Sequence, residues 1–244
     1  MNKQQDKSSS NFKRLRIAHH VSGYAVMSTL LGHQIGLVSI EPDVQLGNLG
    51  FISRGDRKFI FKDGQVPQHK KRALAEFNVL VSLAGPIAEA RYITSNQSGV
   101  LNLNILDYLF KKGSGSAKGW AYAFLDELAK ENFLSLEEQE ELNKSKTCLL
   151  NVADITPHSL QNRFERITQV YMDLLTERCH QIFSLKPVWG ALKNTVQALI
   201  EKETLNGAEV SGICLDYEDF PRIQEKVQQF HFQSCFYSTI FDLT

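Results

Sequence analysis

Apolar and small residues recur every three or four positions from about Phe12 to Leu31, the spacing of one face of an amphipathic helix. Gly32 follows at once and predicts the end of this helix, because glycine readily adopts the left-handed conformation common just past a helix C-terminus. The residues before Phe12 are polar and include a serine run. We therefore expect residues 1–12 to form a disordered tail.

The following segment has the character of short β-strands. Ile35 to Ile40 is a β-branched run that Pro42 ends. Leu49 to Ser53 and Lys58 to Phe61 flank a turn-forming Arg-Gly-Asp-Arg segment. This arrangement predicts a β-hairpin.

Helical patterns dominate the rest of the chain. One helix is expected from about Gln68 to Tyr92, and Gly85-Pro86 inside it predicts a kink or a break. Residues 215–244 are rich in aromatic side chains, and we expect a C-terminal extension packed on the same domain. The whole pattern predicts a mainly α-helical protein with one small β-sheet near its N-terminus. Further helices are expected at about residues 101–111, 119–131, 136–150, 160–183 and 188–202.

Charge and cysteine usage narrow the class of protein. Lysine plus arginine and aspartate plus glutamate both total 27, so nothing indicates a nucleic-acid partner. The best apolar run, Ile17 to Leu31, is too short and too polar to span a bilayer, and no secretory signal is visible. We expect a soluble, cytoplasmic protein without membrane insertion. The cysteines lack the spacing of metal cages or disulfide frameworks and are expected to be reduced, buried thiols: Cys148, Cys179, Cys214 and Cys235.

Four segments, in order, resemble a known family. Ala18 to Ala25 is similar to a Tyr-His-Glu-Ala-Gly-His-Ala helix, and Val38 to Pro42 followed by Leu49 to Phe51 is similar to a strand, proline and Leu-Gly-Tyr edge. Leu83 to Ala90 is similar to a Leu-Gly-Gly-Arg-Ala-Ala-Glu-Glu helix. Ala198 to Val210 strongly resembles a closing helical hairpin that reads LLEKETLDGEEV. All four belong to the zinc-peptidase domain of the FtsH family.

The resemblance implies a compact FtsH peptidase-like helical domain over residues 13–214. Family members normally carry an ATPase module before the peptidase, and this chain has no room for one. Gly113 to Gly119 only superficially suggests a phosphate-binding loop, since its lysine precedes the last glycine. ATP dependence is therefore not part of the expectation.

Of the active-site residues that the resemblance implies, this sequence retains one and replaces the others. His20 matches the first zinc-binding histidine. Val21 stands at the catalytic glutamate, Tyr24 at the second histidine, and Leu103 at the aspartate ligand. A catalytic zinc needs about three protein ligands and an open position for water, and valine cannot move a proton. We therefore expect no catalytic residue, a vestigial His20 hydrogen-bonded to Tyr24, and no cofactor.

Three hypotheses for the function remain. The leading one is a pseudopeptidase that binds a protein or peptide without hydrolysing it. The first alternative is a zinc-dependent metalloendopeptidase with non-standard ligands around His20. The second is a scaffold or regulatory subunit of a larger protease assembly. Homo-oligomerisation is also open, because the aromatic tail from Phe230 to Ile240 could form a dimer contact, although core packing is favoured.

Overall fold

The computed structural model describes residues 3–42, 50–54, 68–95, 105 and 172–233. These residues are mainly helical and include one three-stranded antiparallel sheet, which confirms the predicted combination of helices with a small sheet. None of these helices combines the length and the apolar character that a membrane span requires. The elements are α1 (Lys3–Leu30), β1 (Ile35–Ser39), β2 (Phe51–Arg54), α2 (Gln68–Ser95), α7 (Lys186–Lys202), β3 (Thr204–Asn206), α8 (Gly207–Leu215) and α9 (Phe220–Gln233), with further helical residues at 172–184.

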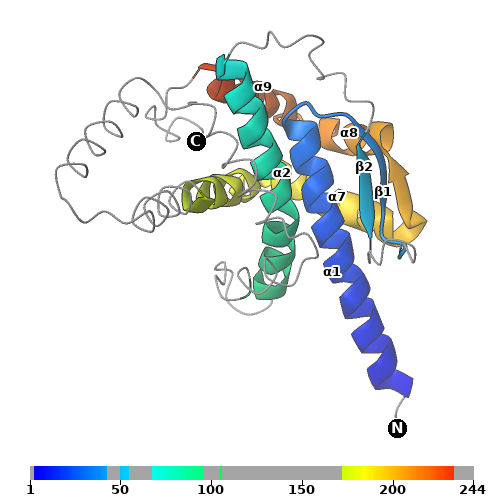
Figure 1. The fold of residues 1–244 in the computed structure, drawn as a ribbon. Helices are drawn as coiled ribbons and strands as arrows, with labels where there is room; N and C mark the ends of the chain where they lie inside the picture. Colours follow the sequence, from blue (N-terminus) through cyan, green and yellow to red (C-terminus); the bar gives the residue numbers. More distant parts are fainter. Residues whose placement is uncertain (1–2, 43–49, 55–67, 96–104, 106–171, 234–244) are drawn as a thin grey trace, which may run out of the picture.

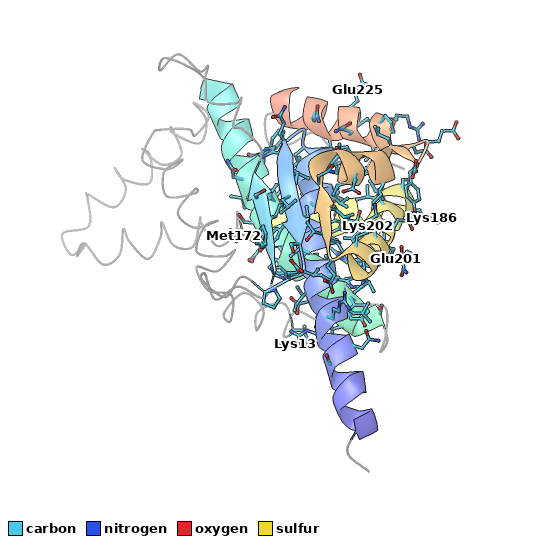
Figure 2. The ribbon with its side chains drawn as sticks, turned by 90° about the vertical axis from the view of Figure 1, so that its right-hand side faces the viewer. Lys13, Met172, Lys186, Glu201, Lys202 and Glu225 are labelled. Carbon is cyan, nitrogen blue, oxygen red and sulfur yellow. The ribbon has the colours of Figure 1, made fainter. Side chains whose placement is uncertain are left out.

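Helix α1 occupies the centre of the fold, with α2 on one side and the sheet on the other (Figure 1). Figure 2 shows the same arrangement from the side, with the strands in front of α1. The central part of α1 is almost entirely buried. Burial on several sides explains why its sequence is apolar over more than one narrow stripe.

The two long helices approach each other closely because glycine and alanine line their contact. A Cβ on Gly23 of α1 would lie 2.5 Å from the Ala84 carbonyl oxygen and 2.8 Å from the Ala88 Cβ of α2. In the reverse direction, a Cβ on Gly85 would lie 2.7 Å from the ring of Tyr24. The Leu83 to Ala90 segment therefore has a packing role, which is to let α1 lie against the backbone of α2.

Both ends of α1 can be compared with the expectation. Gly32 has a φ of +77° and lies directly after the last turn, as predicted. The structure extends the helix back to Lys3, through the residues expected to form a disordered tail. The first turns of α1 project beyond the other described elements (Figure 1).

Helix α2 runs without interruption from Gln68 to Ser95 and contains Pro86. The predicted break is therefore absent. A proline inside a helix costs about 3 kcal/mol, but residues on both sides of it, among them Leu83 and Ile87, are fully buried. We attribute the continuity of the helix to this packing.

The sheet has the order β2-β1-β3, and both neighbours are antiparallel to β1. Val38 in β1 pairs with Ile52 on one side and with Leu205 on the other. Two of these strands were predicted. The expected hairpin partner, Lys58 to Phe61, lies outside the described residues, and among the described strands β2 pairs with β1.

The third strand corrects the prediction of a simple helical hairpin at Ala198 to Val210. Helix α7 ends at Lys202, and Glu203 adopts a left-handed conformation with a φ of 65°. The chain then runs extended for three residues and pairs with β1. Asn206 and Glu209 form a capping box that starts α8, so the two helices are separated by a short strand of the sheet.

The described part of the C-terminal extension, α9, contacts α1, α2 and α8. Phe220 of α9 is fully buried. Gln224 donates a hydrogen bond to the Thr29 carbonyl at 2.6 Å, and Gln228 donates to the Leu30 carbonyl at 3.1 Å. The Thr29 carbonyl also accepts from the Gly32 N–H at 3.0 Å, and Leu30 is the last residue of α1, so both side chains bind the C-terminal end of this helix.

Several predictions fall partly or wholly outside the described residues. The expected helices at residues 119–131 and 136–150 lie entirely outside them. Within the helix expected at 101–111 only Ile105 is described, and it is helical. Within the helix expected at 160–183, residues 172–183 are described and helical.

We expect Gly23→Ala to lower the free energy of unfolding by about 1–3 kcal/mol, because the added methyl group would collide with the α2 backbone. Gly212→Ala in α8 is the matched control, since no described atom lies within 4 Å of its added Cβ. The free energy of unfolding of this control should rise by roughly 0.5–1 kcal/mol, because alanine has a better helix propensity than glycine. Urea denaturation measures the free energy of unfolding of both variants. An equal increase for Gly23→Ala and Gly212→Ala would contradict close packing at Gly23.

Candidate functional site

The candidate site is a polar cluster between α1 and α2, centred on His20. The Nδ1 atom of His20 lies 2.9 Å from Oε2 of Glu89, and its Nε2 atom lies 3.1 Å from the hydroxyl of Tyr24. An ionised carboxylate only accepts hydrogen bonds, so Nδ1 donates to Glu89, and in the neutral ring the Tyr24 hydroxyl donates to Nε2. Both ring nitrogens of His20 are therefore used within the protein, and the predicted bond to Tyr24 is confirmed.

Arg16 completes the cluster one turn before His20. Its Nε and Nη2 atoms lie 2.8 Å and 2.6 Å from Oε1 of Glu89, so one carboxylate oxygen faces Arg16 while the other faces His20. The side chain of Glu89 is only 9% exposed. A carboxylate this buried requires partners, and the two residues from α1 supply them.

The ionisation of Glu89 reflects these opposing influences. Burial acts to raise the pKa of the carboxyl, but the hydrogen bond and charge of His20, followed by those of Arg16, outweigh it. The pKa of Glu89 is therefore held below its usual range. As a result, Glu89 is a stable anion and a weak base.

Tyr24 is the residue that the resemblance aligns with a second histidine ligand. Burial, followed by the negative charge of Glu89, raises the pKa of its hydroxyl well above the usual value. The ring lies against Gly85 and meets the His20 ring edge-on, with centroids 4.9 Å apart. Tyr24 is thus a neutral phenol committed to packing and to one hydrogen bond.

Val21, which the resemblance aligns with a catalytic glutamate, faces an apolar environment. Its side chain is 3% exposed and packs with Ile17 against Gly50 at the edge of the sheet. A carboxylate in this position would be desolvated without a described partner. In the structure, Val21 takes part in hydrophobic packing.

These residues do not fit a catalytic zinc. Zinc would need a free lone pair on His20, and both nitrogens are engaged. Among the described residues, no group of three or more His, Cys, Asp or Glu side chains could hold a metal ion. Leu103, which the resemblance aligns with an aspartate ligand, lies outside the described residues.

His19 belongs to a different surface of α1, as its position next to His20 predicted. Its Nδ1 atom lies 2.8 Å from the Leu15 carbonyl oxygen, and its ring stacks on Tyr92 with centroids 4.1 Å apart. Burial lowers the pKa of this imidazole, against smaller raising effects of the Leu15 hydrogen bond and of Glu89. His19 is therefore a neutral packed side chain outside the His20 cluster.

The described cysteines fit the expectation of buried thiols. Cys179 and Cys214 are free and buried. Burial raises the pKa of Cys214 to about 12 despite a hydrogen bond with Thr29, and it also raises the pKa of Cys179. Neither thiol is a reactive nucleophile.

Two members of the cluster, Arg16 and Glu89, were not predicted from the sequence as site residues. Glu89 lies inside the Leu83 to Ala90 segment that carries the family resemblance, so a signal was available. Arg16 had only its helical spacing of four residues from His20, which places both on one face of α1. Neither signal identifies the contact between the two helices.

We expect Glu89→Gln to lower the free energy of unfolding by about 2 kcal/mol at neutral pH. The substitution removes the negative charge whose two oxygens face Arg16 and His20. The folded pKa of Glu89 lies below the unfolded value near 4.3. Its contribution is thus present above that value and is lost as the pH falls through the folded pKa.

The difference in the free energy of unfolding between Glu89→Gln and the native protein should therefore shrink as the pH falls below the unfolded pKa of a glutamate. Urea denaturation across the pH range measures this trend. Glu218→Gln, at an exposed position, is the control and should leave stability unchanged. A deficit for Glu89→Gln that stays constant with pH would contradict the ion pair.

No protein-family model and no curated protein matches this chain.

Proposed function

We propose that this chain is a catalytically degenerate, FtsH-like peptidase domain that binds a protein or peptide without hydrolysing it. The observation that carries the proposal is the state of His20. Glu89 and Tyr24 occupy its two nitrogens, so the one retained family ligand has no lone pair for a metal.

The remaining chemistry of the cluster also argues against hydrolysis. Peptide hydrolysis by this route needs a polarising metal and a general base for the attacking water. Val21 offers no proton acceptor, and Glu89, the nearest described carboxylate, is paired with Arg16 and has a lowered pKa. The cluster therefore stabilises a helix contact and has no means of generating hydroxide.

The relation to the FtsH family is supported by the way in which two resembling segments meet. Ala18 to Ala25 lies on α1 and Leu83 to Ala90 lies on α2, and these segments pack directly on each other. Binding of a protein or peptide comes from the resemblance, because a peptidase fold without its chemistry retains the class of ligand. The domain would act in the cytoplasm, where Cys179 and Cys214 stay reduced.

One observation favours the alternative of a zinc peptidase. Metal-binding histidines usually donate their second ring nitrogen to a carboxylate, as His20 donates to Glu89. If Tyr24 turned away, Nε2 would be exposed to a metal. A metal assay decides between the two functions.

We expect protein purified without a histidine tag to contain far less than one zinc per chain, because the described donors are already engaged. Elemental analysis of native protein and His20→Ala, both dialysed against zinc and then buffer, measures the content. The native protein and His20→Ala should have the same zinc content. A chelator should leave the melting temperature of the native protein unchanged. The protein should not cleave unfolded casein.

Stoichiometric zinc in the native protein that disappears in His20→Ala would establish the zinc alternative and reject the proposal. His180→Ala is the control for loss of a histidine elsewhere, on the helical residues 172–184. Binding is tested by pull-down from the native cell. Recovery of an active protease in place of extended peptides would favour the scaffold or regulatory subunit.

A further inference from the structure

A pocket lies beside His19, where α1, α2 and α7 converge. It has a volume of about 420 Å³, within the range of small-ligand sites. His19 comes from α1, while Trp189 and Lys193 lie one turn apart on α7. The full lining is His19, Arg91, Tyr92, Ser95, Trp189, Lys193 and Val196.

The walls of this pocket are flat rings held in fixed positions. His19 and Tyr92 stack on each other, and the Arg91 guanidinium lies over the Trp189 ring at 4.2 Å from its centroid. The Trp189 ring also meets Phe183 edge-on, with centroids 6.3 Å apart. Such an arrangement is preorganised for a planar apolar group, because its aromatic side chains are already ordered.

The pocket also contains two cations without an anionic partner among the described residues. Arg91 donates to the Phe183 carbonyl and to the Ser184 hydroxyl, both of which are neutral acceptors. Lys193 is exposed at the rim and makes no described ion pair. Glu89 is the carboxylate whose charge raises the pKa of His19, and it already forms an ion pair with Arg16.

Burial lowers the pKa of Arg91, which means that its charge is held at a cost in free energy. An anion entering the pocket would offset part of that cost. A carboxylate suits a guanidinium particularly well, because the two planar groups can form paired hydrogen bonds.

We propose that this pocket binds a carboxylate attached to a planar apolar group. The carboxylate lies between Arg91 and Lys193, and the planar group lies against Trp189 and Tyr92. Two sources carry this chemistry: the C-terminus of a peptide that ends in an aromatic residue, and a free aromatic acid. The inference is independent of the proposed function, because the pocket does not use the His20 cluster.

Calorimetric titration of the full chain at low salt tests the proposal with three probes. N-acetylphenylalanine represents the peptide terminus, benzoate represents a free aromatic acid, and N-acetylphenylalaninamide has the ring without the charge. We expect N-acetylphenylalanine to bind about tenfold or more tightly than the amide, as a charge-assisted hydrogen bond provides. Tighter binding of N-acetylphenylalanine than of benzoate identifies a peptide terminus, and the reverse order identifies a free acid.

Lys193→Gln should weaken binding of the acid several-fold and leave the amide unaffected. Lys186→Gln, an exposed lysine at the start of the same helix and outside the pocket, is the matched control and should bind like the native protein (Figure 2). Absence of saturable binding by either acid would overturn the proposal. So would equal affinity for acid and amide, or a Lys193→Gln variant that binds the acid as tightly as native protein.

Discussion

The contact between α1 and α2 is the constraint on which the rest of the structure depends. Gly23 and Gly85 bring the helices so close that the Glu89 carboxylate is removed from water. A charge in that position is stable only if partners reach it from the facing helix. Arg16 and His20 are those partners, so tight apolar packing and the polar cluster stabilise each other.

The sequence predicted the elements best where one residue or one periodic face determines the outcome. Gly32 located the end of α1, and the apolar spacing after Val188 located α7 to within two residues of its start. The strand β3 was missed because three residues are too few to show a period of two. Its position depends on pairing with β1, a contact distant in sequence.

From the sequence we could expect which residues of the family motif are replaced. The contacts between side chains on different helices could not be predicted. Comparison with the family motif identified Val21 and Tyr24 from the sequence alone. Periodicity gives the face on which a side chain lies, but it does not give the residue on the opposite helix. The pairing of His20 with Glu89 therefore required the geometry, as did the convergence of Trp189 and Arg91 from different helices.

The polar cluster links stability to a geometry that disfavours a metal at His20. A histidine can orient a metal only if one nitrogen stays free while the other is held. Tyr24 fills that free position through a neighbouring turn of the same helix, and its ring is fixed by Gly85. Turning Tyr24 away would leave a buried hydroxyl without its partner and would loosen the packing at Gly85. The interactions that make the helix contact stable thus oppose the rearrangement that a metal would need.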